Sequence, residues 1–269
     1  MDFSEYVNRY GPTALVTGAS SGIGESFARQ LAARGFDLVL VARKQMVMDG
    51  LADELAEQHN VHVDVVCVDL SEAEAAQTIL SAVEGKEIGL LVSNAGFGLK
   101  GLFADDALER VDAMLMTNAI TPTRLLHGLL PQLTQRNTSG VILTGSMEGE
   151  APFPWSSAYA ASKAYIHALG NGLHEEYRKQ GIDVLVLAPG STDTKAPVEQ
   201  GISRDQLVGI MSPDEVAKQA LNALGKKAVL LPGWYNRVFI ALLRWLPRRW
   251  ALRLSGYGMK RAIDQSHSS

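Results

Sequence analysis

The sequence has 269 residues, of which 46% are hydrophobic, and its formal net charge is −4 at pH 7. A chain of this length can bury one large core, and the slight excess of acids argues against a nucleic acid as a partner. Cys67 is the only cysteine, which excludes an internal disulfide and suits a reducing cytoplasm. The polar amino terminus does not resemble a secretory signal, and the longest apolar run near the carboxyl end, residues 238–243, is far shorter than the roughly 20 residues of a membrane span. We therefore expect a soluble cytoplasmic protein, at most peripheral at a membrane.

Seven short apolar runs alternate with stretches of helical periodicity. The runs are nearly continuous, which is typical of parallel strands covered by helices on both faces. Strands are predicted at 13–17, 36–42, 63–68, 88–93, 141–145, 182–188 and 228–231, and helices at 22–34, 45–59, 72–83, 105–130, 156–180 and 213–224. Ser212 is the predicted N-cap of the last of these helices, with Pro213 in its first position.

This strict alternation predicts an α/β fold with right-handed crossovers. We expect a single doubly wound Rossmann-type domain over residues 1–232, with a seven-stranded parallel sheet and helices on both faces. Residues 233–269 are predicted to form a helical C-terminal arm of the same domain.

A glycine-rich turn separates the first strand from the first helix. It contains, in order, Gly18, Ser20, Ser21, Gly22, Ile23 and Gly24. Such a turn lets the backbone approach a pyrophosphate, which then lies on the amino terminus of the helix. Glycines occur in any tight turn, so it is the position between strand and helix that indicates dinucleotide binding.

The end of the second strand predicts which dinucleotide is bound. An acid there would bind the ribose 2′-hydroxyl of NAD, whereas an arginine accommodates the 2′-phosphate of NADP. Here Ala42 is followed by Arg43 and Lys44, at about the expected 20 residues after the glycines. We predict NADP(H) as the cofactor and both cations as binding residues. The alternative is that they are solvated charges at the start of the next helix.

Polar or small residues follow the third and fourth strands as well. Asp69 and Leu70 close the third strand, where the aspartate can accept a hydrogen bond from the adenine amino group. Ser71, with Glu74 three residues later, predicts a capping box for the next helix, which leaves Asp69 free for that role. Three small residues after the fourth strand would let the cofactor's ribose lie close to the sheet: Asn94, Ala95 and Gly96.

Four side chains are candidates for the chemistry. Tyr159 and Lys163 are four residues apart in a predicted helix, so they share one face. A nearby ammonium favours the phenolate and lowers the tyrosine pKa, and it can also hold the nicotinamide ribose. Ser146 follows the fifth strand and can donate to a substrate oxygen that gains charge. Asn118 is unusual inside a helix and could bind a water that relays protons to Lys163.

Each of these residues is commonplace alone, but together they resemble the short-chain dehydrogenase/reductase family over about residues 11–232. The family's glycine motif corresponds to Gly18, Gly22 and Gly24. The resemblance implies an adenine contact by Asp69 and cofactor contacts by the Asn94–Ala95–Gly96 segment. It also implies a catalytic tetrad of Asn118, Ser146, Tyr159 and Lys163, of which the last two also contact the cofactor.

The resemblance extends to the segment after the sixth strand, which contains Pro189, Gly190, Thr192 and Thr194. It implies that the Thr192 backbone holds the nicotinamide carboxamide and that Thr194 adds a hydroxyl contact. Thr192 replaces a commoner aliphatic residue, and Ser93 replaces a commoner asparagine before Asn94. Neither departure removes a catalytic group.

The family places its substrate above the nicotinamide, between the loops after strands five and six. Here these are residues 147–155 and 195–211. Their apolar side chains, with two from the loop after strand four, predict a mostly apolar pocket: Phe97, Leu99, Met147, Phe153, Trp155, Val198, Ile202 and Met211. The alternative for each of them is ordinary loop packing.

We predict a lipophilic ketone or secondary alcohol as the substrate, no metal, and reduction as the direction. Three alternatives stay open: an NAD-dependent alcohol or hydroxysteroid dehydrogenase, an epimerase or dehydratase, and a non-catalytic dinucleotide sensor. Epimerases and dehydratases usually need a larger carboxyl-terminal domain than this chain has.

The arm has a composition of its own. Residues 234–261 contain seven basic side chains, no acid and three of the four tryptophans. If residues 236–246 are helical, Asn236, Arg237 and Arg244 form a narrow polar stripe, and Pro247 begins a second helix. In that helix Arg249 and Arg253 face one side, and Trp250 and Leu254 another.

Aromatic residues flanked by arginines suit an anionic membrane surface, so we predict that the arm forms a wall of the substrate entrance and lies on such a surface. The alternative is packing against its own domain or against a sister subunit of a homo-oligomer, a dimer or a tetramer.

Overall fold

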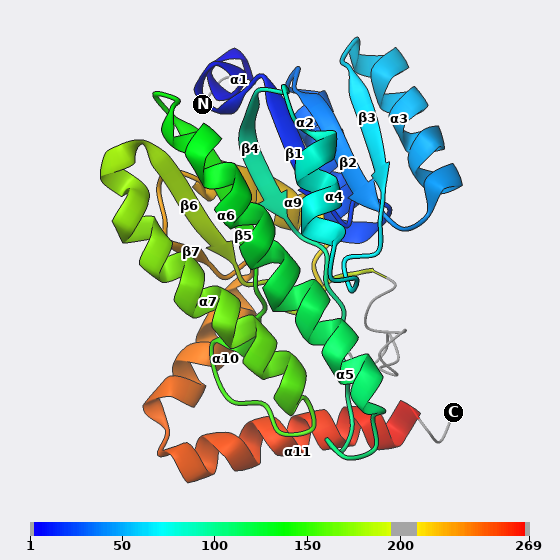
Figure 1. Ribbon diagram of the computed structural model, residues 1–269. Coiled ribbons are helices and arrows are strands. Elements are labelled where there is room, and N and C mark those ends of the chain that lie inside the picture. Colours follow the sequence, from blue (N-terminus) through cyan, green and yellow to red (C-terminus); the bar gives the residue numbers. More distant parts are fainter. Residues whose placement is uncertain (1–2, 195–208, 267–269) are drawn as a thin grey trace.

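The computed structural model describes residues 3–194 and 209–266. Seven parallel strands form one sheet in the order β3-β2-β1-β4-β5-β6-β7 (Figure 1). The strands are β1 Thr13–Thr17, β2 Asp37–Ala42, β3 Val63–Cys67, β4 Ile88–Ser93, β5 Ser139–Thr144, β6 Ile182–Leu187 and β7 Val229–Leu230. The predicted seven-stranded parallel sheet is confirmed.

The strand order explains where a ligand can bind. The chain builds β1, β2 and β3 outward in one direction, then returns to β1 and builds β4 to β7 in the other. The loops that follow β1 and β4 therefore leave in opposite directions and open a crevice at the carboxyl ends of these two strands. Every residue of both strands is buried, so the floor of this crevice is held by the core.

Helices cover both faces of the sheet (Figure 1). They are α1 Phe3–Tyr10, α2 Gly22–Ala32, α3 Gln45–His59, α4 Ala75–Ala82, α5 Leu108–Leu115, α6 Thr121–Thr134, α7 Ser157–Tyr177 and α9 Pro213–Ala223. One core gathers apolar side chains of α1, α2, α3 and α9, and another those of α4, α6 and α7. The predicted N-cap of α9 is confirmed, because the Ser212 hydroxyl accepts from the Glu215 amide at 3.2 Å.

Three elements differ from the prediction. Helix α1 was not expected, and it buries Tyr6 and Tyr10 with ring centroids 4.9 Å apart. The predicted helix 105–130 is two α-helices joined by a π-helical turn, Met116–Ile120. The predicted capping box is wrong: α4 begins at Ala75, and Ser71 instead donates its amide and hydroxyl to Asp69 at 2.9 and 2.8 Å.

The C-terminal arm consists of two helices, α10 Trp234–Trp245 and α11 Arg248–Ser266, as predicted. Figure 1 shows α11 passing across the end of the molecule toward which the strands point, and Ala251 of α11 packs with Ala160 of α7. Buried side chains of the arm, Ile240, Leu243 and Ala251, pack with Phe153 and Ala160. Within residues 3–194 and 209–266, no helix combines the length and apolar character needed to cross a membrane.

The predicted polar stripe of α10 is wrong at one position. Asn236 is buried, and its amide donates to the Pro232 carbonyl at 2.9 Å. It lies against Gly190, where a Cβ would come within 2.4 Å of its nitrogen. The arm therefore begins in direct contact with the segment after β6.

Candidate active site

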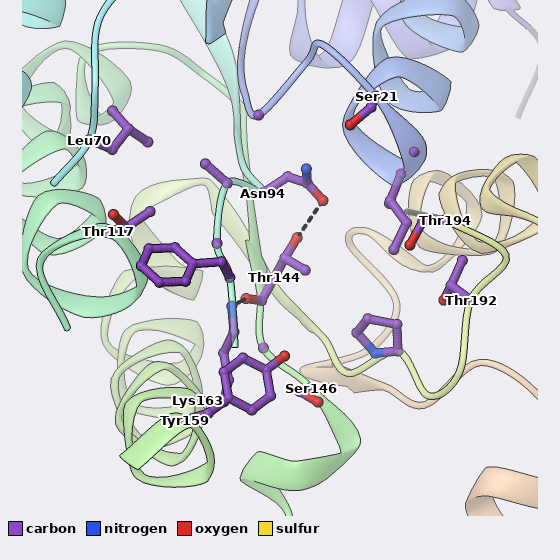
Figure 2. A pocket seen from close by; sticks show the side chains of 18 of the residues that line it. Ser21, Leu70, Asn94, Thr117, Thr144, Ser146, Tyr159, Lys163, Thr192 and Thr194 are labelled. Carbon is purple, nitrogen blue, oxygen red and sulfur yellow. Dashed lines mark hydrogen bonds between the residues drawn. The ribbon is translucent and has the colours of Figure 1, made fainter. Parts of the chain in front are cut away.

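A cleft of about 380 Å³ opens at the carboxyl ends of the central strands, a size typical of small-molecule sites. Most of the predicted site residues line it: Gly18, Ser20, Ser21, Gly22, Ile23, Arg43, Asp69, Leu70, Asn94, Ala95, Gly96, Phe97, Ser146, Met147, Tyr159, Lys163, Pro189, Gly190, Thr192 and Thr194. Figure 2 shows Ser21 at one end of the cleft and Tyr159 with Ser146 at the other. Seven predicted residues that the structure describes lie outside this lining: Gly24, Lys44, Leu99, Asn118, Phe153, Trp155 and Met211.

The turn between β1 and α2 is shaped for a close approach by a ligand. Gly18 and Gly22 have φ of 69° and 58°, which favours glycine. A Cβ at Gly24 would lie 2.1 Å from the Gly18 carbonyl oxygen, so glycine lets α2 pack directly on the turn. The Ser21 side chain caps no amide of α2. The first amides of the helix can therefore bind an anion, and this cradle fits a dinucleotide pyrophosphate.

At the end of β2 the cleft carries a cation and no carboxylate. Arg43 is exposed, and its Nη1 lies 3.5 Å from Asp69 Oδ2. Burial alone would raise the pKa of Asp69, but the hydrogen bonds from Ser71 and the Arg43 charge outweigh it and hold that pKa below its usual value. Lys44 precedes α3 as its N-cap residue, outside the cleft lining.

Lys163 lies deep in the cleft on α7. Its Nζ donates to the Thr144 carbonyl at 2.9 Å and lies 5.9 Å from the centroid of the Tyr159 ring (Figure 2). Burial lowers the pKa of Lys163 to about 8. A Cβ at Gly96 would lie 3.0 Å from this Nζ, so a glycine there leaves space for the ammonium.

Tyr159 lies one helical turn before Lys163, beside Ser146. Burial and the charge of Glu148 raise the pKa of Tyr159, and the Ser146 hydroxyl acts in the opposite direction. The lowering of this pKa by the ammonium of Lys163 stays a prediction.

Comparison with known proteins gives consistent matches over most of the chain. The sequence pattern of the family described as short chain dehydrogenase matches residues 12–204. A 7beta-hydroxysteroid dehydrogenase of Clostridium sardiniense is 32% identical over 238 residues, which cover 88% of this chain and 90% of that protein. The chain belongs to the short-chain dehydrogenase family.

Solved structures of the family are similar in fold. One, from work on the stereoselectivity of 7beta-hydroxysteroid dehydrogenase, has a TM-score of 0.87 at 27% identity and covers 93% of this chain and 98% of its own. A short-chain dehydrogenase from Sphingobium yanoikuyae in complex with NADPH has a TM-score of 0.78 at 31% identity, covering 88% and 97%. The protein is thus an oxidoreductase with the dinucleotide-binding fold of this family.

Asn118, the asparagine that the family resemblance places in the tetrad, is buried in the π-helical turn. Its Oδ1 accepts from the Phe97 amide at 3.0 Å, and its Nδ2 donates to the Phe97 carbonyl at 2.8 Å and to Ser162 Oγ at 3.1 Å. The side chain therefore fixes the segment that leaves β4. A water held by Asn118 stays a prediction, because the amide oxygen can accept a second hydrogen bond.

The predicted apolar pocket is only partly assembled. Phe97 and Met147 line the cleft, whereas Phe153 packs under the arm with Ile240 and Leu243. Trp155 has a φ of 60° and contacts the arm as well, with Lys260 Nζ 5.9 Å from its ring centroid.

The other predicted pocket residues lie elsewhere. Leu99 is buried with Val111 and Met114 of α5, and Met211 pairs with Thr192 in an isolated bridge. Val198 and Ile202 lie outside the described residues.

Two ionic clusters beside the site were missed from the sequence. Lys100 lines the cleft and donates to both oxygens of Glu148 at 2.6 and 2.7 Å. Glu150 contacts His167 Nδ1 at 2.6 Å and also pairs with Arg244 of the arm. The sequence carried one signal for them: Glu148 and Glu150 are two acids in a loop that was expected to be apolar.

Proposed function

We propose that the protein is an NADP(H)-dependent oxidoreductase that interconverts a lipophilic ketone and a secondary alcohol, mainly by reduction. The proposal depends on one observation: Ser146, Tyr159 and Lys163 come together at one end of the cleft. The other end of the same cleft is the start of α2, where no side chain caps the first amides. A proton donor and an anion site thus share one cleft, as hydride transfer with a dinucleotide requires.

Each group has a distinct role in this proposal. The α2 amides would hold the pyrophosphate. The rest of the cofactor would be held by Asn94, Lys163 and the segment from Pro189 to Thr194. The cofactor supplies or accepts the hydride. Tyr159 gives its phenolic proton to the substrate oxygen or takes it back, and Ser146 donates a hydrogen bond to that oxygen.

NADP(H) is preferred over NAD(H) because of the charge at the end of β2. Arg43 lines the cleft and Ala42 offers no carboxylate to the ribose 2′-hydroxyl. The similar Sphingobium structure is a complex with NADPH, which supports this preference. The Asp69 carboxylate lies beside Arg43, but it already accepts two hydrogen bonds from Ser71.

A bulky lipophilic substrate is supported by two observations. Phe97 and Met147 present apolar surface next to Tyr159 in the cleft lining. The 32% identical relative is named for a hydroxysteroid substrate. We therefore propose ketones and alcohols of fused or long hydrocarbon skeletons as the substrate class.

Turnover of a panel of bulky ketones with NADPH and with NADH tests the proposal. We expect faster turnover with NADPH, and we expect Tyr159→Phe to abolish it while NADPH binding and the unfolding midpoint stay the same. A Tyr165→Phe variant is the matched control, since Tyr165 is an exposed tyrosine of the same helix. Cofactor binding without turnover in the wild type would favour the dinucleotide sensor instead.

We also propose that the arm binds an anionic membrane surface. The outer face of α10 carries four residues at helical spacing that are about half exposed or more, here called the outer stripe: Trp234, Val238, Leu242 and Trp245. Trp245 is 90% exposed. Arg249 and Arg253 of α11 lie within 5.7 Å of the Trp250 ring, and residues 234–261 contain no acid. Exposed indoles beside arginines match the interface of an anionic bilayer.

Vesicle sedimentation tests this contact. We expect binding to vesicles that contain phosphatidylglycerol but not to phosphatidylcholine alone, weakened by salt and by the pair Trp234→Ala and Trp245→Ala. Met46→Ala, which removes an 89% exposed side chain of α3, is the matched control. If the tryptophan pair changes the oligomeric state and leaves vesicle binding unchanged, the arm is a contact between subunits.

A further inference from the structure

A buried ion pair lies beside Tyr159 in the lining of the cleft. The Lys100 side chain is only 2% exposed, and its ammonium also donates to Ser156 Oγ at 2.8 Å. The partners come from three segments: Lys100 from the loop after β4, Glu148 from the 3₁₀ turn Met147–Gly149, and Ser156 from the N-cap of α7. With these three bonds the ammonium has used all of its donors.

The ion pair faces the reacting phenol. Lys100 Nζ lies 4.6 Å from the centroid of the Tyr159 ring, closer than the 5.9 Å of Lys163 Nζ. An ammonium at this distance from an aromatic face is attracted to it, and more strongly once the ring carries a phenolate charge. Glu148 acts in the opposite direction, because its charge disfavours the phenolate.

A count of charges shows what Lys100 contributes. The two lysines carry +2, and Glu148 with a Tyr159 phenolate carries −2, so the group is neutral when the phenol is ionised. Without Lys100 the same group carries −1, and this unbalanced negative charge disfavours ionisation of the phenol.

No other charge near Tyr159 takes over this role among the described residues. Helix α5 faces it with the apolar side chains of Val111, Met114 and Leu115. The Glu150 carboxylate, on the far side of the same loop, is paired with His167 and Arg244.

We propose that Lys100 is a positioning residue of the reaction: held by Glu148 and Ser156 against the face of Tyr159, it cancels the Glu148 charge and stabilises the phenolate. The inference rests on the proposed function, since it assigns Tyr159 the proton transfer. It adds a residue outside the predicted tetrad that sets the pH at which the enzyme works.

The test is the pH profile of alcohol oxidation, which needs the phenolate and therefore rises with pH. We expect Lys100→Met to move this rise upward by about one pH unit or more, as an unbalanced neighbouring charge does, and Glu148→Gln to move it downward. The double variant should return close to the wild-type profile. Lys86→Met is the matched control, because Lys86 pairs with Asp64 at 2.7 Å outside the cleft lining.

Two further measurements separate the outcomes. NADPH affinity should stay the same in all variants, since neither Lys100 nor Glu148 is among the residues proposed to hold the cofactor. Tyrosinate absorbance at high pH, taken as the difference between each protein and the same protein with Tyr159→Phe, should be smaller in Lys100→Met even if no substrate is turned over.

The proposal is overturned if Lys100→Met lowers activity equally at every pH and the double variant does not recover, because the pair would then only tether the loops. An unchanged tyrosinate signal overturns it as well. Failure of the proposed function is distinct, since wild-type turnover would then be absent or insensitive to Tyr159→Phe. If Lys100→Met does not fold, the pH profile of Glu148→Gln tests the proposal instead. The proposal is refuted if this profile does not move to lower pH.

Discussion

Replacing the buried Lys163 by methionine should make the protein more stable while it abolishes activity. The Lys163 side chain is 3% exposed, and burial lowers its pKa from 10.5 to about 8. At about 1.4 kcal/mol per pH unit, keeping this ammonium charged at pH 7 costs the fold roughly 3 kcal/mol. Methionine loses the bond to the Thr144 carbonyl, worth about 1 kcal/mol, so the net gain is roughly 2 kcal/mol.

The sign of the pH dependence follows from the two pKa values. Below about pH 8 the lysine is charged in both the folded and the unfolded chain, and the whole penalty is present. Between about 8 and 10.5 the unfolded chain binds the extra proton, so wild-type stability rises with pH, and the penalty falls to about 1.5 kcal/mol near pH 9.5. The advantage of the variant should therefore shrink as the pH rises.

Urea unfolding of the cofactor-free protein at pH 7 and about pH 9.5 measures this difference. The exposed Lys227→Met serves as the control and should show no such pH dependence. The reasoning would be refuted if Lys163→Met were less stable than the wild type at both pH values, or if the gap between them did not narrow.

Four further substitutions give separate predictions. Arg43→Ala should weaken NADPH binding about 10-fold and leave NADH binding unchanged. Charge-assisted hydrogen bonds contribute about 1.5–3 kcal/mol, and the exposure of Arg43 favours the lower end of this range. Equal losses of affinity in titrations with both cofactors would contradict this prediction. Gly24→Ala should reduce stability and cofactor affinity, because its Cβ would meet the Gly18 carbonyl. A Cβ at Gly50 in α3 meets nothing within 4 Å, so Gly50→Ala should stabilise the protein by about 0.5–1 kcal/mol in thermal unfolding. Ser212→Ala removes the N-cap of α9 and should cost about 1 kcal/mol in the same assay, with cofactor affinity unchanged.

The fold could be predicted from the sequence because its signals are local. Continuous apolar runs mark buried parallel strands, and their alternation with helices predicts a doubly wound parallel sheet. The chain positions of the proposed cofactor residues follow from this, since the end of every parallel strand reaches the same edge of the sheet. That edge brings Gly18, Arg43 and Asn94 together in the structure.

What could not be predicted depends on which of several possible partners a side chain contacts. Ser71 has the pattern of a helix cap, but Asp69, two residues before it, takes both of its donors. Lys100 and Glu148 are 48 residues apart, and neither has a local pattern that indicates its partner. Phe153 was assigned to the pocket because its loop is near the site, yet the arm competes for the same side chain.

The contact between Gly190 and Asn236 sets a condition for exchanging carboxyl-terminal helices between relatives of this enzyme. Any side chain at position 190 would collide with the asparagine, and the asparagine in turn is held by the Pro232 carbonyl. A transplanted arm with a larger residue at position 236 would press on the loop beside Thr192. Chimeras designed to broaden substrate range should therefore keep Gly190 and Asn236 together. If only one of the two is exchanged, we expect a change in cofactor affinity as well as in specificity.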